Sequence, residues 1–158
     1  MRVAVLTISD SVAAGKNVDR SGPAVAARCK ELRWEIVSSA ILADDRAAIE
    51  NFLKQTADSR SADLILTTGG TGVGPRDVTP EATLAAVERL IPGFAERMRA
   101  AGAQQTERAW LSRGVCGIRG TSMIINLPGS PKGAVESLDT IAGLLPHAID
   151  VLHGAHHG

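Results

Sequence analysis

The chain has 158 residues, of which 44% are hydrophobic and 22% charged, the length and composition of one soluble globular domain. Its 17 basic and 17 acidic side chains cancel, so no bulk positive field exists to hold nucleic acid or an anionic membrane. We therefore expect neither a nucleic-acid nor a membrane partner, and any anionic ligand must be bound locally.

The chain begins with an apolar run at residues 3–8, far shorter than the roughly 20 residues that cross a membrane. This run is predicted to be a strand, and similar β-rich runs follow at residues 35–42, 64–68 and 123–127. Stretches with helical spacing of apolar residues separate them. Such alternation is typical of a parallel sheet with helices on both faces.

The predicted helices begin where the sequence carries residues suited to a helix start, such as a capping Asp or a Pro in the first turn. The helix from Thr79 is expected to bury Leu84, Val87 and Ile91 on one face until Pro92-Gly93 breaks it. The other expected helices begin at Ser21, after Asp45, near Phe94 and at Pro131, the last running to Leu145 before Pro146 restarts a short helix.

Two extended runs between residues 115 and 127 flank Arg119-Gly120, which predicts a hairpin and an antiparallel strand. The predicted fold class is α/β: a single three-layer α/β/α domain over residues 1–152, with a mostly parallel sheet and one antiparallel strand. Residues 153–158, HGAHHG, are predicted to be a flexible tail. Its three histidines are interpreted as a frayed end and not as a metal site.

Cysteine, tryptophan and histidine have mostly structural interpretations. Two cysteines are too few for a zinc cluster, and their setting favours buried thiols in a reducing cytoplasm over a disulfide or a nucleophile. Both tryptophans are interpreted as packing residues, although the second could line an interface. His147 is interpreted as a satisfied core or surface residue. The residues concerned are Cys29, Cys116, Trp34, Trp110 and His147.

Chemistry is expected just after the strands, because ligands bind beyond the carboxyl ends of a doubly wound sheet. The loop at residues 67–77 is glycine-rich, so its backbone amides can converge on phosphate oxygens. It lacks the ending of a P-loop and the spacing of a dinucleotide fingerprint. A tight turn is the alternative, but Asp77 and the helix start at Thr79 favour an anion site.

The loop at residues 128–133 repeats this pattern. Ser130 offers a hydroxyl, Lys132 a compact cation, and the following helix its free amides. The alternative is a rigid loop with a capping serine and a solvated lysine. Asp10, Asp44 and Asp77 follow three strands, and each alone is most simply a solvated or capping acid. Together they could hold Mg²⁺, which prefers carboxylate oxygen, water and substrate phosphate.

Seven segments in one order resemble the molybdenum-cofactor biosynthesis proteins of the MogA/MoaB type, the molybdopterin adenylyltransferase family. The resemblance covers nearly the whole chain and leaves out the tail beyond Leu152. The segments are LTISDS, DRSGP, LILTTGGTG, PRDVTPEAT, LSR, GIRG and IINLPGSPKG. The chain departs from the family in the segment 107–110, which concerns local substrate contacts, and at Ala43, where a proline is frequent in relatives.

The resemblance implies a single domain that transfers AMP from ATP to molybdopterin and releases pyrophosphate, with Mg²⁺ as cofactor. It implies catalytic and metal-binding roles for Asp44 and Asp77. The implied substrate-binding residues are Ser9, Asp10, Gly69, Gly70, Thr71, Gly72, Thr79, Glu81, Pro128, Gly129, Ser130 and Lys132. It also implies a homotrimer, with hexamers in some relatives, and a downstream molybdate insertase that receives the product.

Three alternatives remain beside this interpretation. A CinA-like nucleotide pyrophosphatase also carries a strand and a double-glycine loop, but the RDVTPEAT segment favours transfer. A paralogue that binds molybdopterin without adenylylating it, or a protein-binding scaffold, could share the fold. The presence of Asp44, Asp77 and Ser130 favours the enzyme.

Overall fold

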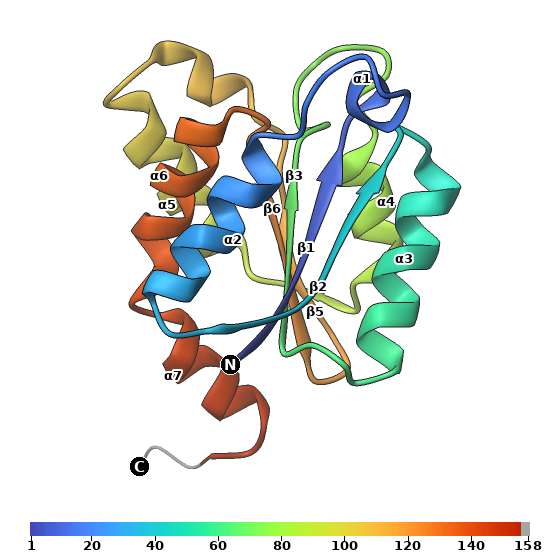
Figure 1. Cartoon of the computed structure of the whole chain (residues 1–158). Helices are drawn as coiled ribbons and strands as arrows, with labels where there is room; N and C mark the ends of the chain where they lie inside the picture. The colour runs from blue at the N-terminus through green and yellow to red at the C-terminus, as the bar shows by residue number, and fades with distance from the viewer. Residues whose placement is uncertain (156–158) are drawn as a thin grey trace.

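The computed structural model describes residues 1–155, which form a six-stranded sheet in the order β2-β1-β3-β6-β5-β4 (Figure 1). Neighbouring strands among β1, β2, β3 and β6 pair in parallel, while β5 pairs antiparallel with both β6 and β4. The predicted α/β fold with one strand of opposite direction is therefore confirmed. The strands are β1 (Arg2–Ile8), β2 (Glu35–Leu42), β3 (Leu64–Thr68), β4 (Arg89–Leu90), β5 (Cys116–Arg119) and β6 (Ser122–Leu127).

Helices cover the sheet on both faces and make it the middle of three layers (Figure 1). One face is covered by α2 (Ser21–Glu31), α5 (Pro92–Ala103), α6 (Pro131–Ala142) and α7 (Leu145–Leu152). The other is covered by α3 (Arg46–Asp58) and α4 (Thr79–Ala86).

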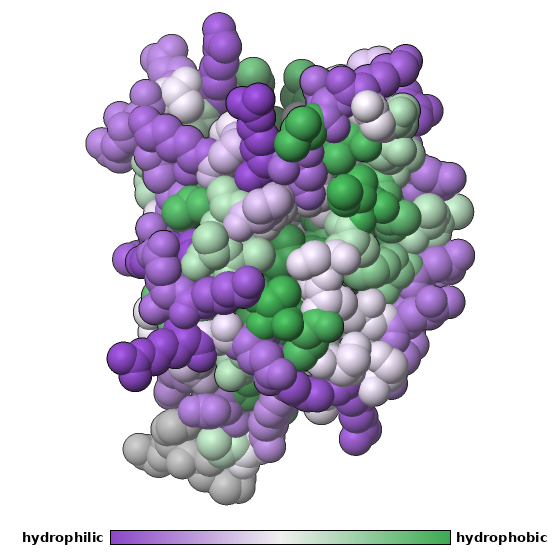
Figure 2. All heavy atoms as spheres, viewed as in Figure 1, coloured by the Kyte–Doolittle hydropathy of each residue, from purple (hydrophilic) through white to green (hydrophobic). Residues whose placement is uncertain are grey.

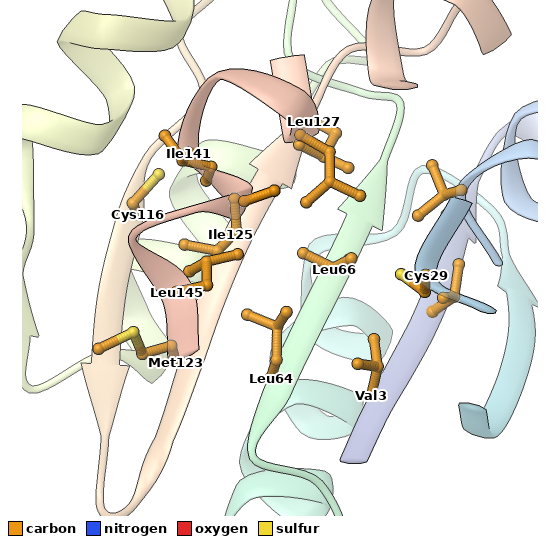
Figure 3. Packing of buried hydrophobic residues seen from close by; sticks show 14 of the residues in the cluster. Val3, Cys29, Leu64, Leu66, Cys116, Met123, Ile125, Leu127, Ile141 and Leu145 are labelled. Atoms are coloured by element: carbon orange, nitrogen blue, oxygen red, sulfur yellow. The ribbon is translucent and has the colours of Figure 1, made fainter. Parts of the chain in front are cut away.

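Successive strand residues feed two separate cores, because side chains alternate across a sheet. Leu64 and Leu66 pack into the core under α2, α5, α6 and α7 (Figure 3), while Ile65 packs into the core under α3 and α4. Val3 and Ala4 divide in the same way. Burial on both faces explains why these strands read as continuous apolar runs.

The helix predicted to run from Thr79 to Ile91 is wrong beyond Ala86. Val87 is extended, and the following residues pair with the hairpin: the amide of Glu88 donates to the carbonyl of Ile118 at 2.7 Å. Pairing at the open edge of β5 therefore outweighs helical spacing. Leu84, predicted to be buried, is 48% exposed.

Besides β4, two further short elements were not predicted, and a second helix boundary differs. They are α1 (Asp10–Ala13) and the 3₁₀ helix η1 (Glu107–Leu111), each of which begins at a hydroxyl that caps it. The last long helix ends at Ala142, so Leu145 begins α7 instead of ending α6.

The packing interpretation is confirmed for Trp34, Cys29 and Cys116, all of which are buried. Burial raises the pKa of Cys29 to about 11 and that of Cys116 to about 12, so neither thiol supplies a thiolate near neutral pH. The packing interpretation is wrong for Trp110, because this side chain is 60% exposed. His147 lies on the surface in α7.

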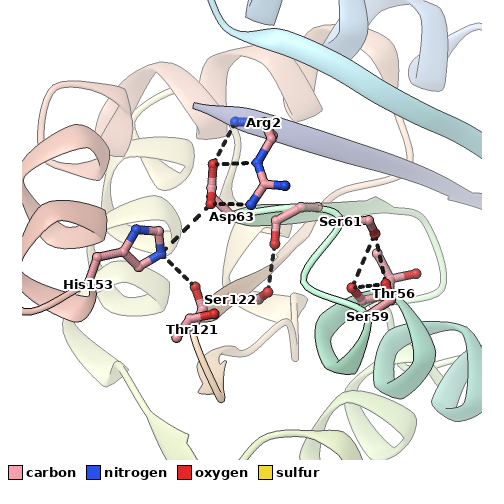
Figure 4. Close-up of polar contacts among 9 residues, drawn as sticks. Arg2, Thr56, Ser59, Ser61, Asp63, Thr121, Ser122 and His153 are labelled. Carbon is pink, nitrogen blue, oxygen red and sulfur yellow. Dashed lines mark hydrogen bonds and ion pairs between the residues drawn. The ribbon is translucent and has the colours of Figure 1, made fainter.

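His153, which follows α7, contacts the end of the sheet at which β1, β3 and β6 begin (Figure 4). His153 Nε2 lies 3.0 Å from the carbonyl of Thr121 and 3.8 Å from Asp63, which also pairs with Arg2. His156 and His157, the other histidines of the predicted tail, lie outside the described residues. Within residues 1–155, no helix has the length and apolar character that crossing a bilayer requires.

Candidate functional site

Two pockets lie where β1, β2, β3 and β6 end. The polar pocket, of about 470 Å³, is bordered by the loops after these strands and by the start of α2. The wide pocket, of about 700 Å³, extends from the glycine-rich loop towards α5 and η1. Gly70, Asp77 and Gly129 border both pockets. The two spaces therefore meet at a junction that contains a carboxylate.

The junction depends on two glycines that other residues cannot replace without strain. Gly69 and Gly70 have φ values of +103° and +69°, a region that favours glycine. A Cβ on Gly69 would overlap the carbonyl oxygen of Ile8, and one on Gly70 would overlap the Thr79 hydroxyl. That hydroxyl donates to the carbonyl of Gly69 at 2.9 Å. Thr79 is fully buried and borders neither pocket, so it supports the turn.

The loop after β6 packs directly against this turn. The amide of Gly69 donates to the carbonyl of Leu127 at 3.2 Å, and the Thr68 hydroxyl donates to that of Pro128 at 2.6 Å. A Cβ on Gly129 would lie 3.3 Å from the Cα of Gly69. The two predicted binding loops are thus one unit.

Ser130 and Lys132, which come just after β6 in the chain, differ in whether they border a pocket. Ser130 borders the wide pocket and also caps α6, because its Oγ accepts the amide of Gly133 at 3.1 Å. Lys132 borders neither pocket; its side chain is 82% exposed and lies 3.8 Å from Glu136. The cation predicted for the phosphate is therefore not among the pocket-lining residues.

Asp44 borders the polar pocket and is held there by Asp10. The amide of each residue donates to the carboxylate of the other, both at 3.0 Å. Burial raises the pKa of Asp44, although the amide of Asp10 opposes this. Oδ1 of Asp44 is buried and has no hydrogen-bond partner among the described residues. An acceptor left in this state is suited to a cation or a donor from a ligand.

Asp10 lies outside both pockets and pairs with Arg76 through two contacts of 3.0 and 3.1 Å. This pair lowers the pKa of Asp10. Ser9, the residue before it, borders the polar pocket and caps α1. Asp10 is thus a support for Asp44.

Asp77 is the carboxylate at the junction. Its Oδ2 accepts the amide of Gly74 at 2.9 Å, and α4 begins after Val78, so Asp77 closes a turn in the loop and does not cap the helix. No group of three or more His, Cys, Asp or Glu side chains arranged for a metal occurs within residues 1–155. Two carboxylates beside a polyphosphate are nevertheless a common Mg²⁺ arrangement, and Asp44 with its unsatisfied oxygen fits it.

The remaining predicted residues divide between lining and support. Thr71 and Gly72 border the wide pocket. Glu81 borders neither pocket, and its carboxylate pairs with Arg113 at 2.7 Å. The structure thus brings the two glycine loops, Asp44 and Asp77 together, and it leaves Asp10, Thr79, Glu81 and Lys132 outside the pocket linings.

Sequence reasoning missed several lining residues. Arg20 borders the polar pocket and Arg108 the wide one, and neither side chain forms an ion pair with the described residues. Met98 and Leu111 form part of the apolar wall of the wide pocket. The DRSGP segment contained a signal for Arg20, whereas Arg108 gave none because η1 was not predicted.

Comparison with known proteins gives one consistent family. Residues 4–147 match the family described as a probable molybdopterin binding domain. The molybdopterin adenylyltransferase of Helicobacter pylori J99 is 38% identical over 98% of this chain and 89% of its own length. The crystal structure of the molybdopterin biosynthesis enzyme MoaB from Thermus thermophilus is 44% identical, with a TM-score of 0.92 over 98% of this chain and 97% of that one.

A longer relative contains the same unit. The molybdenum cofactor synthesis protein cinnamon of Drosophila melanogaster is 41% identical over 94% of this chain, which spans 25% of that protein. The match thus extends to a protein in which this unit is one part. The chain therefore belongs to the molybdopterin-binding family that includes the molybdopterin adenylyltransferase of Helicobacter pylori.

Proposed function

We propose that this chain transfers the adenylyl group of ATP to molybdopterin, giving adenylylated molybdopterin and pyrophosphate. The observation that carries the proposal is the junction at which Gly70, Asp77 and Gly129 border both pockets. A transfer between two bound substrates requires their reacting groups to meet, and alignment is the main source of rate in phosphoryl chemistry. A hydrolase of ATP, or a protein that binds molybdopterin alone, needs no such second pocket.

The residues that line each pocket indicate which substrate the pocket binds. The polar pocket, with Asp44 and Arg20, suits the triphosphate of ATP, because a guanidinium pairs well with phosphate oxygens. The wide pocket, with Met98, Leu111 and Arg108, suits the flat pterin and its phosphate. An oxygen of the terminal phosphate of molybdopterin bonds to the α-phosphorus of ATP. At the same time the bond breaks between that phosphorus and the oxygen that joins it to the β-phosphorus. Pyrophosphate leaves with that electron pair.

Asp44 and Asp77 would hold Mg²⁺ together with phosphate oxygens and water. The ion supplies neutralisation of the charge that two polyanions bring together. The chain's own residues orient the substrates: the amides of Gly70 and Thr71, which border the wide pocket, can donate to phosphate oxygens, and the Asp10 contacts fix the Asp44 carboxylate.

The test is pyrophosphate release by the purified chain with ATP, Mg²⁺ and molybdopterin, compared with reactions that omit each component. We expect release when all three are present. Equal release without molybdopterin indicates a hydrolase. Binding of both substrates with no release indicates a binding protein.

We also propose that the chain forms a homotrimer, which can associate further into a hexamer. Strand β2 is an open edge of the sheet, and Val37 and Ile41 on it are 37% and 46% exposed. Figure 2 shows hydrophobic surface in the middle of the face where Figure 1 draws β2. Covering such an edge supports self-association. Light scattering that gives a monomer mass at micromolar concentration contradicts it.

We further propose a cytoplasmic location for the chain and a partner protein that receives its product. Two buried free thiols, Cys29 and Cys116, support a reducing cytoplasm. We propose that the product passes to a molybdate insertase, since an activated phosphoanhydride is a substrate for a later step. Cell fractionation tests the compartment. Co-purification with product-bound enzyme tests the partner.

A further inference from the structure

The loop that carries Asp77 packs against the core through Val78, which is partly buried, while residues 72–77 have no such apolar contact. Between Thr71 and Thr79, each of which is buried, every residue is exposed or half-exposed, and Val73 is 68% exposed. Hydrophobic packing therefore fixes one end of the loop, at Val78, and leaves residues 72–77 without an apolar contact. Polar contacts must position those residues.

Arg113 supplies contacts at both ends of this loop. Its Nε donates to the carbonyl of Gly72 at 2.7 Å, and its Nη2 donates to the carbonyl of Asp77 at 2.8 Å. Its own amide donates to the carbonyl of Thr71 at 2.8 Å. One planar group thus spans the loop from the residue that borders the wide pocket to the residue at the junction.

Glu81 holds that guanidinium in place. Nη1 of Arg113 donates to Oε2 of Glu81 at 2.7 Å, and Nη2 lies 3.3 Å from Oε1. Glu81 stands in the first turn of α4, which packs on the sheet through Ala82 and Ala86. The loop is therefore tied to a rigid element through a two-point ion pair. Arg113 borders neither pocket, and its side-chain hydrogen bonds are with the protein itself and not with a substrate site.

We propose that Arg113 and Glu81 form a positioning pair that sets Asp77 at the junction of the two pockets, so that both act on the reaction through Asp77. The inference rests on the proposed adenylyl transfer and deepens it. Glu81, which the family resemblance implies to be substrate-binding, then has an indirect role. Arg113 acts through directed hydrogen bonds to three residues, Gly72, Asp77 and Glu81, and its charge alone does not replace them.

Replacement of Arg113 by Lys separates charge from geometry. Lysine keeps the charge but presents one ammonium group, which cannot reach Gly72, Asp77 and Glu81 at once. We expect Arg113→Lys to lower kcat about 10- to 100-fold, the usual effect of losing a supporting partner, with the KM for molybdopterin changed much less. Glu81→Gln, a milder change that keeps an acceptor, lowers kcat in the same direction. The double variant loses less than the two single losses combined.

Arg119 offers a matched control. It also makes a two-point ion pair, with Asp58 at 2.9 and 3.0 Å, and donates to the carbonyl of Ala86 at 2.9 Å. It borders neither pocket. Arg119→Lys therefore has a comparable structural effect without touching the loop that carries Asp77.

The experiment measures kcat and KM for the wild type, Arg113→Lys, Glu81→Gln and Arg119→Lys, and amide hydrogen exchange over residues 72–78 in each. The proposal expects faster exchange in this loop and reduced kcat for the first two variants alone. It is overturned if Arg119→Lys loses as much kcat, or if exchange in the loop is unchanged by Arg113→Lys and by Glu81→Gln. If the wild type itself transfers no adenylyl group, the proposed function fails, and the exchange results still decide whether the pair positions the loop.

Discussion

Asp10 and Asp44 hold each other through reciprocal hydrogen bonds, in which the amide of each residue donates to the carboxylate of the other at 3.0 Å. The bonds join the ends of β1 and β2. They leave Oδ1 of Asp44 buried without a partner among the described residues, beside Gly70. The unpaired Oδ1 lowers the stability of the folded chain, and it leaves an acceptor available to a ligand.

Asp44→Asn tests this account through pH. Burial raises the pKa of Asp44 in the folded chain. Its contribution to stability is therefore full below its unfolded pKa, about 4, and is lost as the pH rises through the folded pKa. Asn has no such loss, so we expect the Tm of Asp44→Asn relative to wild type to rise with pH through this window. Turnover should fall by orders of magnitude at neutral pH.

Thermal melts of both proteins at several pH values measure the difference in Tm. A difference that falls as the pH rises means that the carboxylate is stabilising when charged and contradicts the account.

Asp77→Asn separates catalysis from loop structure. The Asn oxygen can still accept the amide of Gly74, so we expect the Tm to stay within a few degrees, a change below about 1 kcal/mol. Turnover should fall by orders of magnitude, because the charge at the junction is lost, while molybdopterin binding survives. Near-normal turnover, or inactivity that follows unfolding, assigns Asp77 to structure alone.

Gly70→Ala tests the turn. At its φ of +69°, a Cβ is strained and also overlaps the Thr79 hydroxyl. Gly120 is the matched control, because its φ is +56° and nothing lies within 4 Å of a Cβ there. Gly120→Ala should cost about 1 to 2 kcal/mol, the backbone cost alone, and leave turnover intact. Gly70→Ala should cost more and abolish turnover. Equal melting shifts and equal turnover contradict the predicted close approach.

Arg20 and Arg108 test how the substrates are divided between the pockets. Each borders one pocket without an ion pair among the described residues. Arg20→Gln should raise the KM for ATP about tenfold, equivalent to about 1.4 kcal/mol. Arg108→Gln should raise that for molybdopterin. Lys132→Ala, at the exposed lysine that borders neither pocket, should change neither value by more than about twofold. Steady-state kinetics with each substrate varied measure all three.

The sequence was sufficient for the layers and for β1, β3 and β6, because strands buried on both faces leave long apolar runs. It also located the exposed edge strand β2, whose Ile and Val residues favour a strand. It was insufficient for β4, because Val87 and Ile91 fit helical spacing, while the pairing of Arg89 and Leu90 with β5 is a tertiary contact. Boundaries set by nonlocal pairing are not encoded in local periodicity.

The candidate site divides in a similar way. Glycines and acids after strands could be located, since the ends of parallel strands meet at one edge. Which side chains face the pockets could not, because Lys132 and Arg20 look alike in sequence and differ only in the surface that each reaches. The supporting contacts of Glu81 depend on Arg113, 32 residues away along the chain.

The fate of the α-phosphate distinguishes adenylyl transfer from hydrolysis. With ATP labelled at the α-phosphorus, together with Mg²⁺, molybdopterin and the purified chain, the account predicts that the label appears in a molybdopterin product as pyrophosphate is released. The same label should stay in ATP when molybdopterin is omitted. Label recovered as free AMP, in the presence or absence of molybdopterin, contradicts adenylyl transfer and identifies a hydrolase.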